Sequence, residues 1–448
     1  MPLGGNELKS SSRRRVVGPL AILAIFGLGI TGCSSTAAAA GGAVGKADGV
    51  VTITGPITDN DAKLLEQSWS AWAAKNHITI NYSGSKDFEE QIGGAAQQGN
   101  APDLAIFEQP GLIGDLASRG YLKAEPAAVN ANIKANYTKD WGSYTTFKGV
   151  QYASPLLASL NGWVWYSPKQ LAGWGVDVPS NWSDLYRLSQ TLQSKMGGAP
   201  WCEGFSSDAA SGAAGTDWIE DLVLRQDGAA VYDQWVKHEI PFSDPRIKRA
   251  FDDAAEILLD KNYVNAGMGD VNSIDTTSTL DVARALVSGK CALTHQGTSF
   301  LGELQDPSVG APTVGPHGDL WAFMLPPLQT NDIPVTGGGD FVAAFSNDAD
   351  TVKVQKYLSS TSWAKSRVAL GGAISPDRSL LPGSASSPLL QYSIELLQSP
   401  DTTFRFDGSD LMPSIVGSGS FWTGMVDWVK GTATTKVLKT IDDSWPTD

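Results

Sequence analysis

The sequence has few cysteines and histidines, fewer basic than acidic residues, and no long apolar run. Three cysteines and four histidines occur among 448 residues. No HExxH metal-binding spacing, nucleophile elbow or catalytic Cys-His pair is present. Lys and Arg total 33 against 47 Asp and Glu, a formal net charge of −14. Because nucleic-acid binding needs clustered basic residues, we expect no nucleic-acid partner. The sequence also predicts no metal site and no cofactor.

The one apolar run near the N-terminus, residues 16–30, leads into a cysteine. It follows the three arginines 13–15 and ends at Ile30, just before Thr31-Gly32-Cys33. The run is shorter than the ~20 residues that span a bilayer, and this order is typical of a secretory signal peptide. The cysteine after the small residues resembles a bacterial lipobox. We predict a signal peptide at residues 1–32, lipidation of Cys33, a flexible spacer at residues 33–48, and anchoring to the outer face of the cell membrane.

The remaining cysteines, Cys202 and Cys291, are expected to pair. An oxidising exterior favours a disulfide, while two separate buried thiols are the alternative.

The mature chain of 448 − 32 = 416 residues is too long for one simple core, which suggests two lobes. Residues 50–54, 77–82 and 103–107 are predicted strands, and residues 59–76 and 87–99 are predicted helices. This alternation is typical of an α/β fold with a parallel sheet. Such sheets bind ligands beyond the carboxyl ends of their strands, so Asp59, Asn60, Glu108 and Gln109 are candidate site residues.

Further elements are predicted along the second half of the chain. A helix follows residues 179–185 with Ser180 or Ser183 as its cap, and two more helices cover residues 217–226 and 245–259. A short strand covers residues 290–294, and the last helix covers residues 421–429. The chain also holds fifteen tryptophans, many beside polar residues, which suggests a surface that stacks on sugar rings.

Several passages together carry a family resemblance. They are Ala101-Pro102-Asp103-Leu104-Ala105, Leu160 to Tyr166, Pro200-Trp201-Cys202, residues 215–221, residues 231–235, Lys290-Cys291, Gly337-Gly338-Gly339-Asp340 and Gly419-Ser420-Phe421-Trp422. In order and spacing they resemble the family-1 extracellular solute-binding proteins of carbohydrate ABC importers, the group that contains maltose-binding protein. The alpha-glucoside-binding members are the most similar. Asn161-Gly162 and His295-Gln296-Gly297 depart from that pattern, which bears on the exact sugar.

The resemblance implies a hinged, two-lobe α/β fold of the type II periplasmic-binding-protein class. The expected N-terminal lobe comprises residues 49–158 plus 297–348, and the C-terminal lobe comprises residues 159–296 plus 349–448. A monomer without enzymatic activity would hold a di- or oligosaccharide between the lobes. It would deliver that sugar to ABC permease subunits served by a cytoplasmic ATPase.

Sugar hydroxyls both donate and accept hydrogen bonds, so fixed carboxylates and amides suit them. We expect Asp340 to accept from hydroxyls, with Gly338 and Gly339 allowing close approach, and Trp422 to stack on a sugar ring. A turn Asp and a core Trp are the alternatives. The other expected ligand-binding residues are Asn161, Asp217, Trp218 and Gln296.

Two other functions stay open. A secreted carbohydrate-active hydrolase would use Glu108 and Asp340 as its carboxylate pair. The same fold could instead carry a polyol or a glycerophosphodiester.

Overall fold

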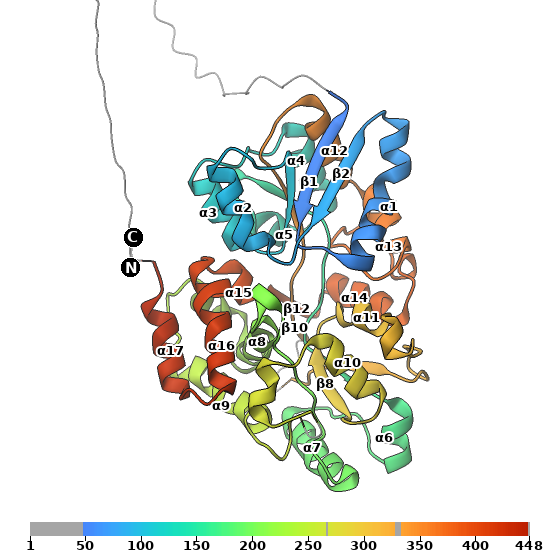
Figure 1. Ribbon diagram of the computed structural model, residues 1–448, viewed down its shortest axis with the longest axis vertical. Helices are drawn as coiled ribbons and strands as arrows, with labels where there is room; N and C mark the ends of the chain where they lie inside the picture. Colours follow the sequence, from blue (N-terminus) through green and yellow to red (C-terminus); the bar gives the residue numbers. More distant parts are fainter. Residues whose placement is uncertain (1–47, 266–267, 328–332, 447–448) are drawn as a thin grey trace, which may run out of the picture. The chain divides into compact units, whose positions relative to one another are not determined.

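The computed structural model describes residues 48–265, 268–327 and 333–446 (Figure 1). The predicted signal peptide, the lipidation site Cys33 and all of the spacer except Asp48 lie outside these ranges. Within them, no helix combines the length and the apolar character that crossing a membrane requires.

A five-stranded sheet forms the first lobe, in the order β2-β1-β3-β11-β6. Strands β1, β2 and β3 run parallel, and β11 pairs antiparallel with β3 and β6. The strands are β1 (Val50–Gly55), β2 (Thr79–Gly84), β3 (Leu104–Phe107), β6 (Ala153–Pro155) and β11 (Phe341–Ala344). The predicted alternation of strand and helix over residues 50–107 is therefore confirmed.

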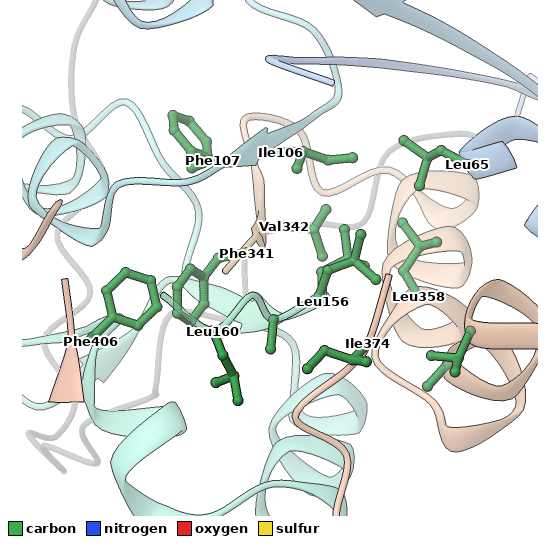
Figure 2. Packing of buried hydrophobic residues seen from close by; sticks show 14 of the residues in the cluster. Leu65, Ile106, Phe107, Leu156, Leu160, Phe341, Val342, Leu358, Ile374 and Phe406 are labelled. Carbon is green, nitrogen blue, oxygen red and sulfur yellow. The ribbon is translucent and has the colours of Figure 1, made fainter. Parts of the chain in front are cut away.

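Seven helices described for this lobe surround the sheet. They are α1 (Asp59–Lys75), α2 (Phe88–Gln97), α3 (Pro110–Ser118), α4 (Ala127–Asn136), α5 (Lys139–Ser143), α12 (Ala349–Leu358) and α13 (Thr361–Ala369). Figure 2 shows Leu65 of α1, Ile106 of β3 and Val342 of β11 in one apolar cluster with Leu358. Burial of these side chains drives this lobe to fold.

Two smaller sheets belong to the second lobe. Strand β7 (Trp163–Tyr166) lies between β8 (Leu293–Gln296) and β9 (Trp321–Met324), antiparallel to both. Strand β10 (Ile333–Gly337) runs parallel to β12 (Thr402–Phe406). A hairpin of β4 (Thr146–Phe147) and β5 (Val150–Gln151) is separate from these sheets.

The remaining helices include four that begin with a side-chain cap. In α9, Pro245 occupies the first turn and the Asp244 side chain accepts from the Arg246 amide, which satisfies a free N–H of the helix end. Their bounds are α6 (Pro168–Trp174), α7 (Trp182–Met196), α8 (Ala213–Val236), α9 (Pro245–Leu258), α10 (Thr279–Val287), α11 (Phe300–Leu304), α14 (Pro388–Gln398), α15 (Gly408–Leu411), α16 (Trp422–Val429) and α17 (Thr434–Asp443). The π-helix η5 (Ile415–Phe421) leads directly into α16.

Three segments cross between the lobes side by side. The first joins β6 to β7, the second joins β10 to β11, and the third follows α13. The Ser159 amide donates to the Gly338 carbonyl (3.0 Å), and the Ala158 amide donates to the Ile374 carbonyl (2.9 Å). These bonds tie the three crossing segments together.

The lobe boundaries differ from the expected ones in two places. Strand β9, expected with the N-terminal lobe, pairs with β7 of the second lobe. Helix α12, expected with the C-terminal lobe, packs against β1 and β11 of the first sheet. The second and third crossings therefore lie near residues 338 and 371, not near residues 296 and 348.

Two local predictions were also wrong. The cap of α7 is Asn181, whose side chain accepts from the Asp184 amide, and neither Ser180 nor Ser183 serves. Strand β8 begins at Leu293 and not at Lys290.

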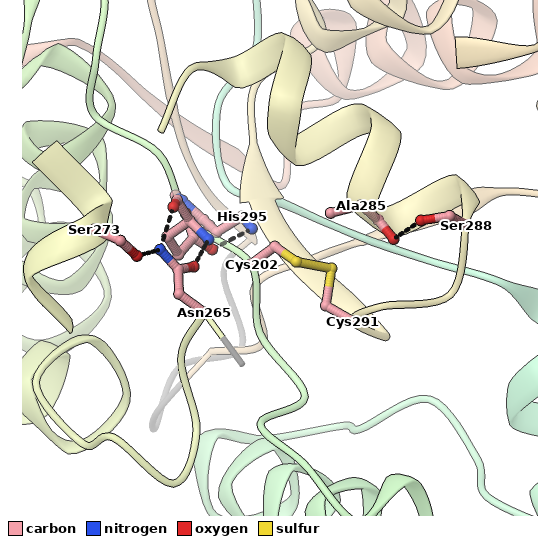
Figure 3. The surroundings of a disulfide bond; sticks show 8 residues. Cys202, Asn265, Ser273, Ala285, Ser288, Cys291 and His295 are labelled. Atoms are coloured by element: carbon pink, nitrogen blue, oxygen red, sulfur yellow. Dashed lines mark hydrogen bonds between the residues drawn. A yellow bond between two sulfur atoms is a disulfide. The ribbon is translucent and has the colours of Figure 1, made fainter. Parts of the chain in front are cut away.

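The predicted disulfide between Cys202 and Cys291 is present (Figure 3). The Cys202 amide donates to the Leu293 carbonyl at 2.9 Å. The bridge therefore fastens the segment that starts at Trp201 alongside the first residues of β8.

Candidate ligand-binding cleft

A cavity of about 310 Å³ lies where the lobes meet at the crossing segments. Both lobes supply its wall. Most of the predicted ligand-binding residues line it, namely Glu108, Gln109, Asn161, Asp217, Gly338, Gly339, Asp340 and Trp422. Residues more than 300 positions apart in the sequence are thus brought to one site.

The first lobe contributes the ends of its strands. Glu108 and Gln109 follow β3, and Asp340 lies just before β11, which pairs with β3. Gly339 is required there, because a Cβ atom at this position would lie 2.4 Å from the Leu157 carbonyl oxygen. The Asp340 Oδ1 atom is buried and has no hydrogen-bond partner within the described structure, so it is available to a ligand hydroxyl.

The second lobe contributes side chains that Asn161 holds together. The Asn161 amide nitrogen donates to Asp217 Oδ1 (3.1 Å) and to Asp407 Oδ2 (3.0 Å). Asp217 lies in the first turns of α8, whereas Asp407 follows β12. One amide thereby fixes two carboxylates on the cavity wall.

Trp422 reaches the cavity because two elements meet closely behind it. Its side chain is 8% exposed, and its indole N–H has no partner among the described residues. Gly212 caps α8 with φ of +104°, and a Cβ atom there would lie 2.1 Å from the Trp422 carbonyl oxygen. Only glycine permits this contact between α8 and the start of α16.

The electrostatics of the cavity are dominated by acids. Burial raises the pKa of Asp340 to about 7, even though the Arg367 charge opposes this shift. The Glu108 side chain is open to the cavity, but the cavity walls limit its hydration, and this effect and the Asp340 charge raise its pKa to about 8. Burial, followed by the Glu220 charge, raises the pKa values of Asp217, Asp407 and Asp410.

Four predicted site residues lie elsewhere. Asp59 and Asn60 are exposed at the start of α1, and Asp61 faces the cavity in their place. Trp218 is fully buried, with its ring centroid 5.5 Å from that of Trp201. Gln296 is buried in β8 away from the cavity wall. Helical and strand periodicity turns each of these side chains away from the site.

Several cavity residues were missed by the sequence reasoning. Arg367 comes from α13, which was expected in the other lobe, and its guanidinium lies 3.8 Å from the Asp61 carboxylate. Asp407, Ser409 and Asp410 follow β12. Their signal was available, because they come directly after a strand end, but β12 itself was not predicted.

The sequence matches the bacterial extracellular solute-binding protein family over residues 55–364, more than half of its length. The chain belongs to this family. The solute-binding protein is 32% identical to the "Osmoprotective compounds-binding protein GgtB" of Synechocystis sp., covering 88% of this chain and 92% of the relative. It is also 32% identical to the "Alpha-glucosides-binding periplasmic protein AglE" of Rhizobium meliloti, covering 88% of this chain and 86% of that relative.

Solved structures share its fold. The solute receptor AcbH superimposes with a TM-score of 0.74 at 17% identity, over 89% of this chain and 98% of that one. RafE in complex with raffinose gives a TM-score of 0.68 at 15% identity, over 88% and 98%. The solute-binding protein therefore has the two-lobe type II fold, as predicted. Its relatives are binding proteins, and its family acts outside the cytoplasm.

Proposed function

We propose that this solute-binding protein captures a neutral di- or oligosaccharide of the alpha-glucoside type and delivers it to an ABC permease. The observation that carries the proposal is the cavity wall, where Asp340, Asn161 and Asp217 lie within reach of a solute that also meets Trp422. Carboxylates and amides accept and donate to hydroxyls, and an indole face suits the apolar face of a sugar ring. The name of the Rhizobium relative supports the same class.

A small polyol-type osmoprotectant is the second candidate. The Synechocystis relative is named for osmoprotective compounds and is equally identical to this chain. The cavity of about 310 Å³ is at the lower end of the range of about 300–1,000 Å³ for small-molecule sites. This volume favours a solute of one or two rings over a long oligosaccharide.

The charges of the wall argue against an anionic solute such as a glycerophosphodiester. Phosphate binding relies on basic clusters or helix N-termini. Arg367 is the single basic residue on the described cavity wall, among Asp61, Glu108, Asp217, Asp340, Asp407 and Asp410.

We also propose that the protein binds its solute without turning it over. Glu108 and Asp340 are near enough for the Asp340 charge to raise the pKa of Glu108. Two such carboxylates are also what glycoside hydrolysis needs. The curated relatives are named as binding proteins, which supports binding alone.

Calorimetry with maltose, trehalose, sucrose and sorbitol tests the proposal. We expect at least one of the three sugars to bind with a Kd below about 1 mM, equivalent to about −4 kcal/mol, and to be recovered intact. Asp340→Asn is the matched variant, because it keeps the shape of the side chain and replaces one accepting carboxylate oxygen with a donating amide group. Binding of sorbitol alone would favour the second candidate, and cleavage of a sugar would overturn the receptor assignment.

The anchoring of the protein is a separate proposal. We infer that Cys33, outside the described residues, carries the lipid that holds a monomer beside its permease, whose ATPase subunit is cytoplasmic. A tether raises the local concentration of the receptor at the permease without a new contact. Cys33→Ser in the full-length chain should move the protein from the membrane fraction to the soluble fraction. An unchanged membrane fraction would contradict lipidation at this residue.

A further inference from the structure

Three carboxylates converge behind the cavity wall of the second lobe. Asp217 and Glu220 are one helical turn apart on α8, and Asp407 reaches them from the end of β12. Each offers one oxygen atom, and these atoms all lie within 4.8 Å of one another. Asp217 and Asp407 line the cavity, whereas Glu220 is fully buried behind them.

The hydrogen bonds around the cluster leave oxygen atoms unused. Glu220 Oε1 accepts from the Ser409 amide at 2.8 Å, and Asn161 donates to the other two carboxylates. Glu220 Oε2 and Asp407 Oδ1 are buried without a hydrogen-bond partner among the described residues. A buried carboxylate oxygen without a partner costs free energy, and a group bound where the three carboxylates converge would relieve that cost.

Charge balance indicates the sign of that group. Within the described ranges, none of the three carboxylates is in an ion pair with Lys, Arg or His. The nearby Arg225 is paired with Asp221 at 2.6 Å. Buried charges in proteins are normally paired or coordinate a metal ion. A bound cation would supply the missing partner.

We propose that Asp217, Glu220 and Asp407 bind a Ca²⁺ ion beneath the floor of the solute cavity. Ca²⁺ takes six to eight oxygen ligands at about 2.3–2.6 Å in flexible geometry, so oxygens within 4.8 Å of one another can share one ion. Mg²⁺ demands a smaller, nearly octahedral shell and retains its waters, which suits carboxylates from two separate elements less well.

The ion also affects the solute. Asp217 and Asp407 face both the ion and the cavity, and hydroxyl groups of a solute are hard oxygen ligands of the kind Ca²⁺ accepts. Solute affinity should therefore depend on Ca²⁺. This coupling rests on the proposed function, whereas Ca²⁺ binding itself does not.

Calorimetry on chelator-treated, sugar-free protein tests the ion site directly. We expect the wild type to bind one Ca²⁺ ion more tightly than Mg²⁺, and Glu220→Gln to weaken Ca²⁺ binding at least tenfold. Glu203→Gln is the matched control. Glu203 is equally buried in the same lobe, accepts from a backbone amide through Oε1 and leaves Oε2 unpaired, but lies outside the cluster. This control should bind Ca²⁺ like the wild type.

The outcomes separate the two proposals. Absence of Ca²⁺ binding to the wild type would overturn the ion site, and so would equal binding by folded Glu220→Gln. A sugar Kd that falls at least fivefold on adding Ca²⁺ supports the coupling. Sugar binding without any response to Ca²⁺ leaves the proposed function intact and overturns the coupling. Ca²⁺ binding without sugar binding supports the ion site and overturns the proposed function together with the coupling. Preference for an amine-bearing sugar in place of Ca²⁺ would assign the cation to the solute and overturn the ion site.

Discussion

Two tryptophans predicted to contact the solute have different surroundings. Trp422 lies on the cavity wall with an unpaired indole N–H. Trp218 lies in the core, with its ring centroid 4.5 Å from that of His295. Both have polar sequence neighbours, so local composition does not separate them. The difference arises because Trp422 follows the π-helix η5 at the cavity, whereas Trp218 faces inward from α8.

Trp422→Ala should weaken sugar binding at least tenfold. The substitution removes a large aromatic surface, and well-packed aromatic residues commonly contribute about 2 kcal/mol or more to binding. Trp422→Phe keeps a ring but loses the indole N–H, so it should retain much of the affinity. Calorimetric Kd values for both variants check the prediction, and wild-type affinity in Trp422→Ala would contradict a stacking role.

Glu203 should make folding stability depend on pH. Burial raises its pKa from 4.5 to about 8. Between these two pH values the folded protein therefore keeps a proton on Glu203 that the unfolded chain has lost. Stability contributed by this group is complete below pH 4.5 and falls as the pH rises to 8. Glu203→Gln removes that dependence.

We therefore expect Glu203→Gln to gain stability relative to the wild type between pH 5 and pH 8, by on the order of 1 kcal/mol or more. Denaturant unfolding at both pH values measures the difference. The Asn265 side chain accepts from the Glu203 amide at 2.8 Å and donates to the Glu203 carbonyl at 3.0 Å. These two bonds keep the backbone at residue 203 in place in the variant (Figure 3 shows Asn265). Parallel pH profiles for the two proteins would contradict the assignment.

At the scale of elements, the disulfide and helix α8 organise the second lobe. The bridge joins residues 89 positions apart and holds Trp201 beside β8. The indole N–H of Trp201 donates to the Ser189 hydroxyl of α7 at 2.9 Å. Helix α8 carries Asp217 and Glu220 near its start and pairs Arg225 with Asp221 further along. One helix thus supplies both the site and its structural support.

Replacing both Cys202 and Cys291 with Ser should lower the free energy of unfolding by about 2–5 kcal/mol, since a cross-link that closes a long loop restricts the unfolded chain. Chemical denaturation under oxidising conditions measures the loss. Under reducing conditions the wild type should approach the variant. Equal stability of the oxidised wild type and the double variant would rule out this contribution. Sugar affinity serves as a control, since neither cysteine lines the cavity.

At the scale of the whole molecule, the three crossing segments connect the two lobes. The apolar cluster of the first lobe continues along them to Leu160 and Phe406 (Figure 2). The crossings have few residues and are joined by backbone hydrogen bonds, such as that of the Ser159 amide to Gly338. This construction suits a hinge, in which a few residues absorb the motion.

Solute binding should draw the lobes together. Small-angle scattering should show the radius of gyration falling by on the order of 1 Å from a value near ~22 Å when sugar is added. Trp422→Ala at the same sugar concentration is the control and should show a smaller change. An unchanged radius in wild-type protein saturated with sugar would contradict closure.

Much of the fold could be predicted because its signals are local. β-branched residues mark β1, and Leu65 and Trp69 at helical spacing mark α1. Site residues directly after strands, such as Glu108, could be found in the same way. Arg367 could not, because its place depends on which lobe α13 joins. Asp407 also follows a strand end, but that strand, β12, was not predicted, and its partner among the described strands is the distant β10.

The sequence by itself determined the class of fold, the family, the order of the main elements and eight residues of the cleft, because helical periodicity and the ends of strands can be recognised from neighbouring residues. The tertiary structure alone decided which lobe β9 and α12 belong to, that Trp218 lies in the core, and that Asp407 meets Asp217 and Glu220. Those outcomes depend on packing between segments far apart in the chain, for which no local pattern exists.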